Sequence, residues 1–351
     1  MLKTTLMSRI LLVAMATFFL NLSFAQINVQ WESRYDGTGS FIDKATDLEL
    51  DAAGNTYATG SFTGSITIGG DTYNAGLTTQ CFVVKLSSAG AVLWSLASSG
   101  DDKAYGHAIY VDDGGNVYVG GHHTQTTTTF GALNLNSTAN EEMFILKITP
   151  NGVPYNIKGP DLANNGKSQI LGITGDNDDI YVTGFYFQQP LLFGGITLPS
   201  PIQDDIFIGK IDSALTACAW LQEHGQAGSG SGPRKEHGTD LVLDGNDLYV
   251  TGYGDKGGSI FYSSGTDYII PTYDHSSIWL AKCATNNGNI LWMTHGASPV
   301  AISQSLGVDF DGTHAFITGF YSDSLQLVST PSQTGPWTYN DTLFSNGGRD
   351  I

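Results

Sequence analysis

Short runs of alternating apolar and polar residues recur five times along this chain, and each run ends in aspartate. The runs are ATDLELD to Asp51, HAIYVD to Asp112, LGITGD to Asp176, TDLVLD to Asp244 and LGVDFD to Asp311. Alternation with period two predicts a strand with one buried face. A tight turn rich in Asp, Gly and Asn follows each run, which is typical of a β-hairpin.

The strand predicted after each turn carries an aromatic residue three positions before a glycine. The five pairs are Tyr57 with Gly60, Tyr118 with Gly121, Tyr181 with Gly184, Tyr249 with Gly252 and Phe316 with Gly319. The spacings are 61, 63, 68 and 67 residues, and self-similarity at a nearly fixed period predicts an array of supersecondary units. A glycine inside a strand indicates a close backbone approach or a bend.

Two more strands are predicted in each complete unit. The third strand has an aromatic residue three positions before a lysine: Phe82 and Lys85, Phe144 and Lys147, Phe207 and Lys210, Trp279 and Lys282. Because four of 15 basic residues share one position of the repeat, we expect a structural role, with each lysine stem along an aromatic face of the adjacent strand. The fourth strand is expected to end in an aromatic residue, at Trp94, Tyr155, Trp220 and Trp292.

These elements predict an all-β protein, a β-propeller of four-stranded antiparallel blades with about five blades visible and the last one incomplete. The expected units are residues 31–94, 95–155, 156–220, 221–292 and 293–351, within a propeller domain at 26–351. Residues 26–31 (QINVQW) match a fourth strand and are expected to close the ring. Because Asp350-Ile351 align with Asp205-Ile206, the fifth unit is expected to lack its third and fourth strands. We expect a fragment of a longer protein; a five-bladed ring that closes badly is the alternative.

The ordered motifs resemble the SBBP-type bacterial β-propeller repeat. That repeat has an alternating strand ending in Asp, then GNxYxTG, a loop with FG, DxFVxKL, Gly and Trp. The matching stretches here are DAAGNTYATG, DDGGNVYVGG, IYVTGF, DDIFIGKI and NGNILW. The resemblance covers the chain from about Trp31 onward and implies a secreted or surface-exposed protein. It also implies a longer parent, in which a C-terminal sorting domain directs outer-membrane export (type IX secretion).

The first 25 residues are typical of a Sec-type signal peptide. Lys3 and Arg9 precede an apolar run at 10–20, and small residues end the segment at Ala25. The run is too short to span a membrane. We therefore expect a secreted or cell-surface protein; an uncleaved N-terminal anchor is the alternative.

Charge and cysteine content narrow the class of partner and the source of stability. The formal net charge is −18, which argues against nucleic acid and anionic membranes as partners and favours a soluble, monomeric module. Cys81, Cys218 and Cys283 are too few for a disulfide scaffold. We expect them to be small buried residues rather than functional thiols.

Candidate binding residues lie where the units depart from the repeat. The second-to-third and fourth-to-first connections are long and variable and emerge on one face, which is where a ligand is expected. The candidates are His122, His123, His224, Arg234, His237 and Trp337. Arg234 and His237 belong to a long connection at 223–238 that is either a binding loop or a tolerated insertion. The histidines are expected to be exposed or to line a channel.

Metal and carbohydrate binding have weaker signals. A metal site would need histidines to converge with Glu141 or Glu142. The Asp-rich turns resemble calcium loops without the full twelve-residue spacing, so no cofactor is expected and calcium stays an alternative. Aromatic residues outside the repeat could stack on sugars or anchor loops: Phe187, Tyr262, Tyr268, Tyr273, Trp337 and Tyr339.

No catalytic motif is present: the chain has no nucleophile elbow, phosphate loop or HExxH sequence. The first hypothesis is therefore a non-catalytic, secreted or cell-surface binding or adhesion scaffold for an extracellular glycan or protein ligand. The alternative is an extracellular carbohydrate-active enzyme, a glycan hydrolase or lyase, that uses the long-loop face.

Overall fold

The computed structural model describes residues 43–137, 140–162, 166–201, 203–225, 235–254, 260–261, 268–270, 276–297, 302–328 and 339–350. These residues lie within one compact unit, Tyr35–Ile351. The predicted signal peptide, the predicted closing strand at 26–31 and the candidate residues Arg234 and Trp337 lie outside the described residues. In the described ranges there is no helix that could span a bilayer.

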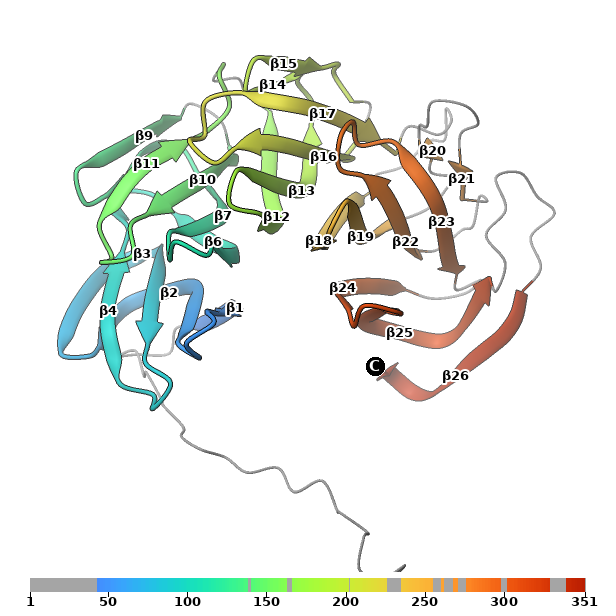
Figure 1. The fold of residues 1–351 in the computed structure, drawn as a ribbon, viewed down its shortest axis with the longest axis horizontal. Coiled ribbons are helices and arrows are strands. Elements are labelled where there is room, and N and C mark those ends of the chain that lie inside the picture. The colour runs from blue at the N-terminus through green and yellow to red at the C-terminus, as the bar shows by residue number, and fades with distance from the viewer. Residues whose placement is uncertain are drawn as a thin grey trace, which may run out of the picture. The chain divides into compact units, whose positions relative to one another are not determined.

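The described chain is all-β, and its strands form successive antiparallel four-stranded sheets, which is a propeller-like arrangement (Figure 1). The first sheet contains β1 (Lys44–Leu50), β2 (Thr56–Ile68), β3 (Asp71–Leu86) and β4 (Val92–Ala97). The second contains β6 (Ala104–Val111), β7 (Val117–His123), β10 (Glu142–Ile148) and β11 (Pro154–Lys158). The third contains β12 (Lys167–Gly175), β13 (Asp179–Phe187), β16 (Asp205–Asp212) and β17 (Cys218–His224). Each of these twelve strands overlaps a predicted one.

The fourth and fifth units share one seven-stranded sheet. It contains β18 (Glu236–Asp244), β19 (Asp247–Gly254), β22 (Ser277–Ala284), β23 (Ile290–Ala297), β24 (Ser303–Phe310), β25 (Ala315–Val328) and β26 (Tyr339–Asp350). Two residue pairs between β23 and β25 join the units. Asp350 pairs with Tyr321 as Asp205 pairs with Tyr186, so the predicted alignment of these two aspartates is confirmed. Preceding Asp350, β26 adds a paired segment that the sequence pattern did not predict.

The long second-to-third connections contain regular structure, which the sequence reading treated as variable loops. They include β8 (Thr126–Phe130) with β9 (Leu133–Ser137), β14 (Leu191–Phe193) with β15 (Ile196–Leu198), and β20 (Ile260–Phe261) with β21 (Tyr268–Ile269); β5 (Ser99–Gly100) pairs with β8. The β8–β9 and β14–β15 hairpins pack on the fourth strand of their own unit, and a Cβ at Gly194 would lie 2.5 Å from Cys218 Sγ. In the next unit, β20 contacts β17 of the unit before it. Much of each connection is therefore committed to packing.

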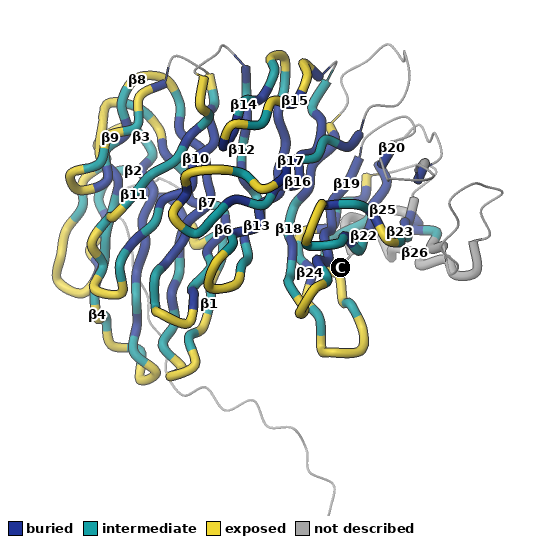
Figure 2. The backbone as a smooth tube through the Cα atoms, turned by 45° about the horizontal axis from the view of Figure 1, so that its top comes forward, coloured by how far each residue is buried: buried dark blue, intermediate teal, exposed yellow. Residues whose placement is uncertain are grey.

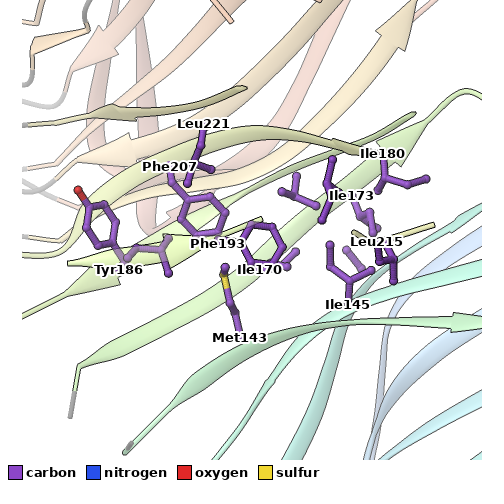
Figure 3. Packing of buried hydrophobic residues seen from close by; sticks show 14 of the residues in the cluster. Met143, Ile145, Ile170, Ile173, Ile180, Tyr186, Phe193, Phe207, Leu215 and Leu221 are labelled. Atoms are coloured by element: carbon purple, nitrogen blue, oxygen red, sulfur yellow. The ribbon is translucent and has the colours of Figure 1, made fainter. Parts of the chain in front are cut away.

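The first strand of each later unit packs against the sheet before it. Thus β12 contacts β6, β7 and β10, and β18 contacts β12, β13 and β16. Figure 3 shows the layer between the second and third sheets, where Met143, Ile145, Ile170 and Phe207 belong to one buried cluster. Figure 2 shows burial concentrated in the middle strands and exposure in the tight turns. One apolar layer therefore joins each pair of neighbouring sheets.

The predicted contact between each repeat lysine and the aromatic residue of the adjacent strand is confirmed in all four units. The lysine ammonium lies over the tyrosine ring at 4.7 Å for Lys85 on Tyr57, 5.1 Å for Lys147 on Tyr118, 5.4 Å for Lys210 on Tyr181 and 5.5 Å for Lys282 on Tyr249. In each case the two residues are direct cross-strand partners. The repeat lysines therefore stabilise the sheets.

The fourth strands do not end at their aromatic residue as predicted. β4 continues three residues past Trp94 because Phe82, Val83 and Val84 of β3 pair with that extension. The tryptophan instead reaches the next unit: Trp94 Nε1 donates to Pro150 O at 3.1 Å, and Trp220 Nε1 donates to Thr285 O at 2.9 Å. The repeat tryptophan thus links neighbouring units at their outer edge.

We expect Lys210→Met to lower the free energy of unfolding by about 1 kcal/mol. The variant keeps the apolar stem but loses both the contact with Tyr181 and the 2.7 Å ion pair with Asp179. Urea unfolding followed by tryptophan fluorescence measures the change. Lys103→Met is the control, because Lys103 is exposed. Equal losses for the two variants would contradict a stabilising role for the repeat lysine.

Candidate functional site

Each repeat glycine lies against a backbone carbonyl of the first strand, which explains why glycine recurs there. A Cβ added at these positions would lie about 2 Å from that oxygen: 2.0 Å at Gly60, 2.0 Å at Gly121, 1.9 Å at Gly184, 2.1 Å at Gly252 and 2.1 Å at Gly319. The predicted close approach is therefore confirmed. Beside each glycine, the register of the first strand shifts by one residue.

The register shift is a β-bulge, and it leaves one residue per unit outside the strand ladder. In the third unit Ile170 pairs with Gly184 and Gly172 pairs with Thr183, so Leu171 is the bulged residue. The bulged residues of the five units are Thr46, His107, Leu171, Thr239 and Leu306. A bulge turns a side chain away from the direction that regular pleating would give it.

All five bulged residues line the same cavity, of about 720 Å³. We call it the bulge cavity. Gln169, His237 and Gln304, each two residues before a bulge, also line it, as do Phe185, Phe187 and Tyr253 from the second strands. The first strands begin at the end of the sheets where the long connections lie. The residues two positions before each bulge therefore lie nearer that end than the bulged residues do. The cavity volume is in the range of small-molecule sites.

The bulged residues present a mostly apolar surface. Leu171 and Leu306 are aliphatic, and Leu306 is 55% exposed. Thr46 Oγ1 donates to Gly106 O at 2.7 Å, and Thr239 Oγ1 donates to Thr251 O at 3.2 Å. Both hydroxyl groups therefore donate to the backbone. The apolar part of each threonine side chain is its methyl group.

His107 is the polar member of this set, and it is uncharged at neutral pH. Burial, with a smaller contribution from Lys44, lowers the pKa of its imidazole to about 4. His107 Nε2 lies 2.7 Å from His122 Nδ1, and the His122 ring stacks on Tyr105 at 4.6 Å. This stack fixes the imidazole of His107 at the cavity wall.

Two carboxylates on the wall are held by neighbouring side chains. Glu141 accepts from Lys167 Nζ at 3.0 Å and from Gln169 Nε2 at 2.8 Å. Asp204 Oδ2 lies 3.1 Å from His237 Nε2. Gln169 and His237 occupy equivalent positions in the third and fourth units. Each bonds to a carboxylate of the unit before it, so the same link between neighbouring units occurs twice. Acidic groups at the cavity are therefore charge-balanced or hydrogen-bonded within the protein.

His237 is fixed by three neighbours. Its ring stacks on Phe185 with centroids 3.9 Å apart and an interplanar angle of 6°. Its Nδ1 lies 2.9 Å from the Tyr253 hydroxyl, while its Nε2 faces Asp204. Because the Asp204 carboxylate can only accept, His237 Nε2 donates the hydrogen bond between them. This network gives the cavity one rigid polar wall.

The prediction that the candidate histidines are exposed or line a channel is wrong for His122, His123 and His224. They are 7%, 0% and 1% exposed, because His122 and His123 pair with β10 inside the second sheet and β17 continues past Trp220, which was expected to end it. Burial lowers the pKa of His123 to about 4 and that of His224 to about 3. The His224 ring stacks on Phe261 of the loop hairpin at 5.4 Å. Their side chains therefore lie inside the protein and not on its surface.

The predicted long connection is shorter than expected, and His237 is not a loop residue. His237 lies in β18 and lines the cavity. Lys235, just before that strand, also lines the cavity. Among the loop aromatics, Phe187 lines the cavity, whereas the Tyr268 hydroxyl donates to Leu291 O at 2.9 Å and so anchors its hairpin. Tyr262 and Tyr273 lie outside the described residues.

The Asp-rich turns and the cysteines have structural roles. Asp112 accepts from the backbone N–H of Asn116 at 2.8 Å and from its Nδ2 at 2.8 Å, which closes the turn. In the described part of the chain, no three His, Cys, Asp or Glu side chains gather as a metal site would require.

Cys81 and Cys283 are buried as expected, whereas Cys218 is half-buried. Burial raises the pKa of all three thiols to about 12.

Sequence reasoning missed the bulged residues, although a signal exists. Each lies five positions before the aspartate that ends its strand: Thr46, His107, Leu171, Thr239 and Leu306 precede Asp51, Asp112, Asp176, Asp244 and Asp311. The aspartate is constant while the residue five positions earlier varies. Alternation alone does not show which variable position leaves the ladder, because the bulge depends on pairing with the second strand.

Comparisons with known proteins leave the family open. No protein-family model matches this chain, and no curated protein matches it. Among solved structures, the chain is similar to quinohemoprotein alcohol dehydrogenase ADHIIG from Pseudomonas putida HK5, with 13% identity and a TM-score of 0.37. The match covers 84% of this chain and 44% of that one, so the chain spans less than half the length of that enzyme. At this similarity nothing about activity or cofactor follows for this chain.

Proposed function

We propose that this chain is a non-catalytic, extracellular binding module built as a β-propeller, and that the bulge cavity is its ligand site. Secretion follows from the signal-peptide pattern of the first 25 residues, and the SBBP-type motifs support the propeller. The expected ligand is an extracellular glycan. One observation carries the proposal: in each of five units a bulged residue of variable identity lines one cavity, while the glycine beside the bulge and the aspartate five positions after it stay constant.

The wall chemistry favours binding over catalysis. A hydrolase needs a carboxylic acid and a carboxylate free to act on the substrate. Here Glu141 is paired with Lys167 at 3.0 Å, and Asp204 is hydrogen-bonded to His237. Aromatic and amide groups around an apolar surface are instead typical of a recognition site.

A glycan array with a parallel hydrolysis assay tests this proposal on the full chain. We expect binding without turnover, and we expect Leu306→Asp to weaken binding at least tenfold because it places a charge on the apolar wall. Leu93→Asp is the matched control: Leu93 in β4 is 53% exposed, against 55% for Leu306, but does not line the cavity. Product formation would support the carbohydrate-active enzyme instead. Equal binding by both variants would place the ligand elsewhere.

A further inference from the structure

We propose that the bulge cavity recognises the acetamido group of an N-acetylated sugar in a neutral glycan. This inference rests on the proposed function, since it names the ligand class of the same site. It follows from the order of chemical groups along the cavity wall.

An apolar surface and hydrogen-bonding groups lie two residues apart on the same strands. On β12, Gln169 precedes the bulged Leu171, and on β24, Gln304 precedes the bulged Leu306; all four side chains line the cavity. An acetamido group has matching parts, a methyl group next to an amide. Leu171, Leu306 and the methyl groups of the two bulged threonines would surround the ligand methyl.

The two amides together offer the acceptor and the donor that an acetamido group needs. Gln169 Nε2 is already used by Glu141, so Gln169 Oε1 remains as an acceptor for the ligand N–H. The Gln304 side chain makes no hydrogen bond to any described residue, so its Nε2 can donate to the ligand carbonyl. A buried amide of the ligand would otherwise be left without partners, which is costly.

The charges favour an uncharged sugar. Glu141 pairs with Lys167, the cavity also has one further acid, Asp204, and one further base, Lys235, and His107 is neutral at pH 7. The formal charges of these lining residues therefore cancel. The whole chain carries a formal charge of −18, which disfavours approach by acidic glycans. An N-acetylated neutral sugar fits both conditions, whereas its deacetylated amine would bring a charge against the apolar surface.

Calorimetric titration of the full chain with N,N′-diacetylchitobiose, cellobiose and L-fucose tests this inference. Cellobiose has the same linkage without acetamido groups, and L-fucose has a methyl group without an amide. We expect diacetylchitobiose to bind at least tenfold more tightly than either. Equal binding of cellobiose would overturn the acetamido assignment, and equal binding of fucose would reduce the specificity to a methyl group and overturn it as well.

Paired substitutions at Thr239 locate the acetamido group at the bulged residues. Thr239→Ser keeps the hydroxyl bond to Thr251 O and removes the methyl, so it should weaken diacetylchitobiose binding about fourfold. Thr239→Val keeps a methyl group for contact with the ligand and should bind within about twofold of the native protein. If glycans bind in a Leu306-dependent way but both Thr239 variants match the native protein, the acetamido assignment fails while the proposed function stands. If no glycan depends on Leu306, both fail.

Discussion

Replacing Gly184 with alanine is expected to lower the free energy of unfolding by roughly 3 to 5 kcal/mol. The added Cβ would lie 1.9 Å from Gln169 O and 3.1 Å from the ring of Phe207. Neither neighbour can move freely, because Gln169 is a cross-strand partner of Phe185 and Phe207 is buried. The variant should therefore push β12 and β13 apart at the bulge. Urea unfolding followed by circular dichroism measures the loss.

Gly195→Ala separates this clash from ordinary glycine effects. Gly195 has φ of +83° at a hairpin tip, and a Cβ there would meet nothing within 4 Å. Its cost should be only the left-handed backbone strain, about 1 kcal/mol. If Gly184→Ala costs no more than Gly195→Ala, the close approach does not explain the repeated glycine.

Asp240 is expected to make the protein less stable as the pH rises through the neutral range. Its Oδ1 accepts from the N–H of Leu241 at 2.8 Å, and its Oδ2 accepts from the N–H of Val308, in the next unit, at 2.8 Å. Burial raises the pKa of this carboxyl to about 7; the two backbone bonds lower it, and the charges of Asp47 and Asp309 raise it further. A raised pKa means that the folded protein holds a proton that the unfolded chain releases near pH 3.8.

The sign of the effect follows from that difference. Stability from Asp240 is fully present below about pH 4 and is lost as the pH rises through about 7. The whole change is on the order of 4 kcal/mol, of which roughly 2 to 3 kcal/mol falls between pH 5 and pH 8. We expect Asp240→Asn to remove this dependence, because its side chain does not ionise.

Urea unfolding at several pH values, for the native protein and for Asp240→Asn, isolates this contribution as a difference. Asp71→Asn, at an exposed turn, is the control and should follow the native protein. If the difference between the native protein and Asp240→Asn does not change with pH, Asp240 does not titrate in this range. A stability that increases with pH relative to the variant would reverse the inferred sign.

The repeat pattern predicted the sheets well because the residues at its positions make contacts that recur from one unit to the next. Tyr181, Gly184 and Lys210 each have one local reason for their identity, namely a ring in the core, a close carbonyl and a cation over the ring. Such reasons act between adjacent strands, so they recur with the strand pattern. They could therefore be recognised in the sequence alone.

The site was harder to predict because it depends on contacts between units. His122 looked functional as a polar residue at a variable position, yet it is buried in a stack with Tyr105 and His107. His237 was named for its position in a basic segment, whereas the structure shows it at the cavity wall for another reason, its bonds to Asp204 and Tyr253. Periodicity gives the face of a strand but not which neighbouring unit lies opposite.

The bulges have a consequence for how such a protein can diversify. A bulged residue is outside the hydrogen-bonded ladder, so exchanging its side chain leaves the register and the apolar layers between sheets intact. The five units of this protein already show such variation, because the bulged position holds His107 in one unit and Thr or Leu in the others. Five such positions can vary independently around one cavity, so duplication and divergence of units could yield new specificities while selection on folding stays nearly unchanged.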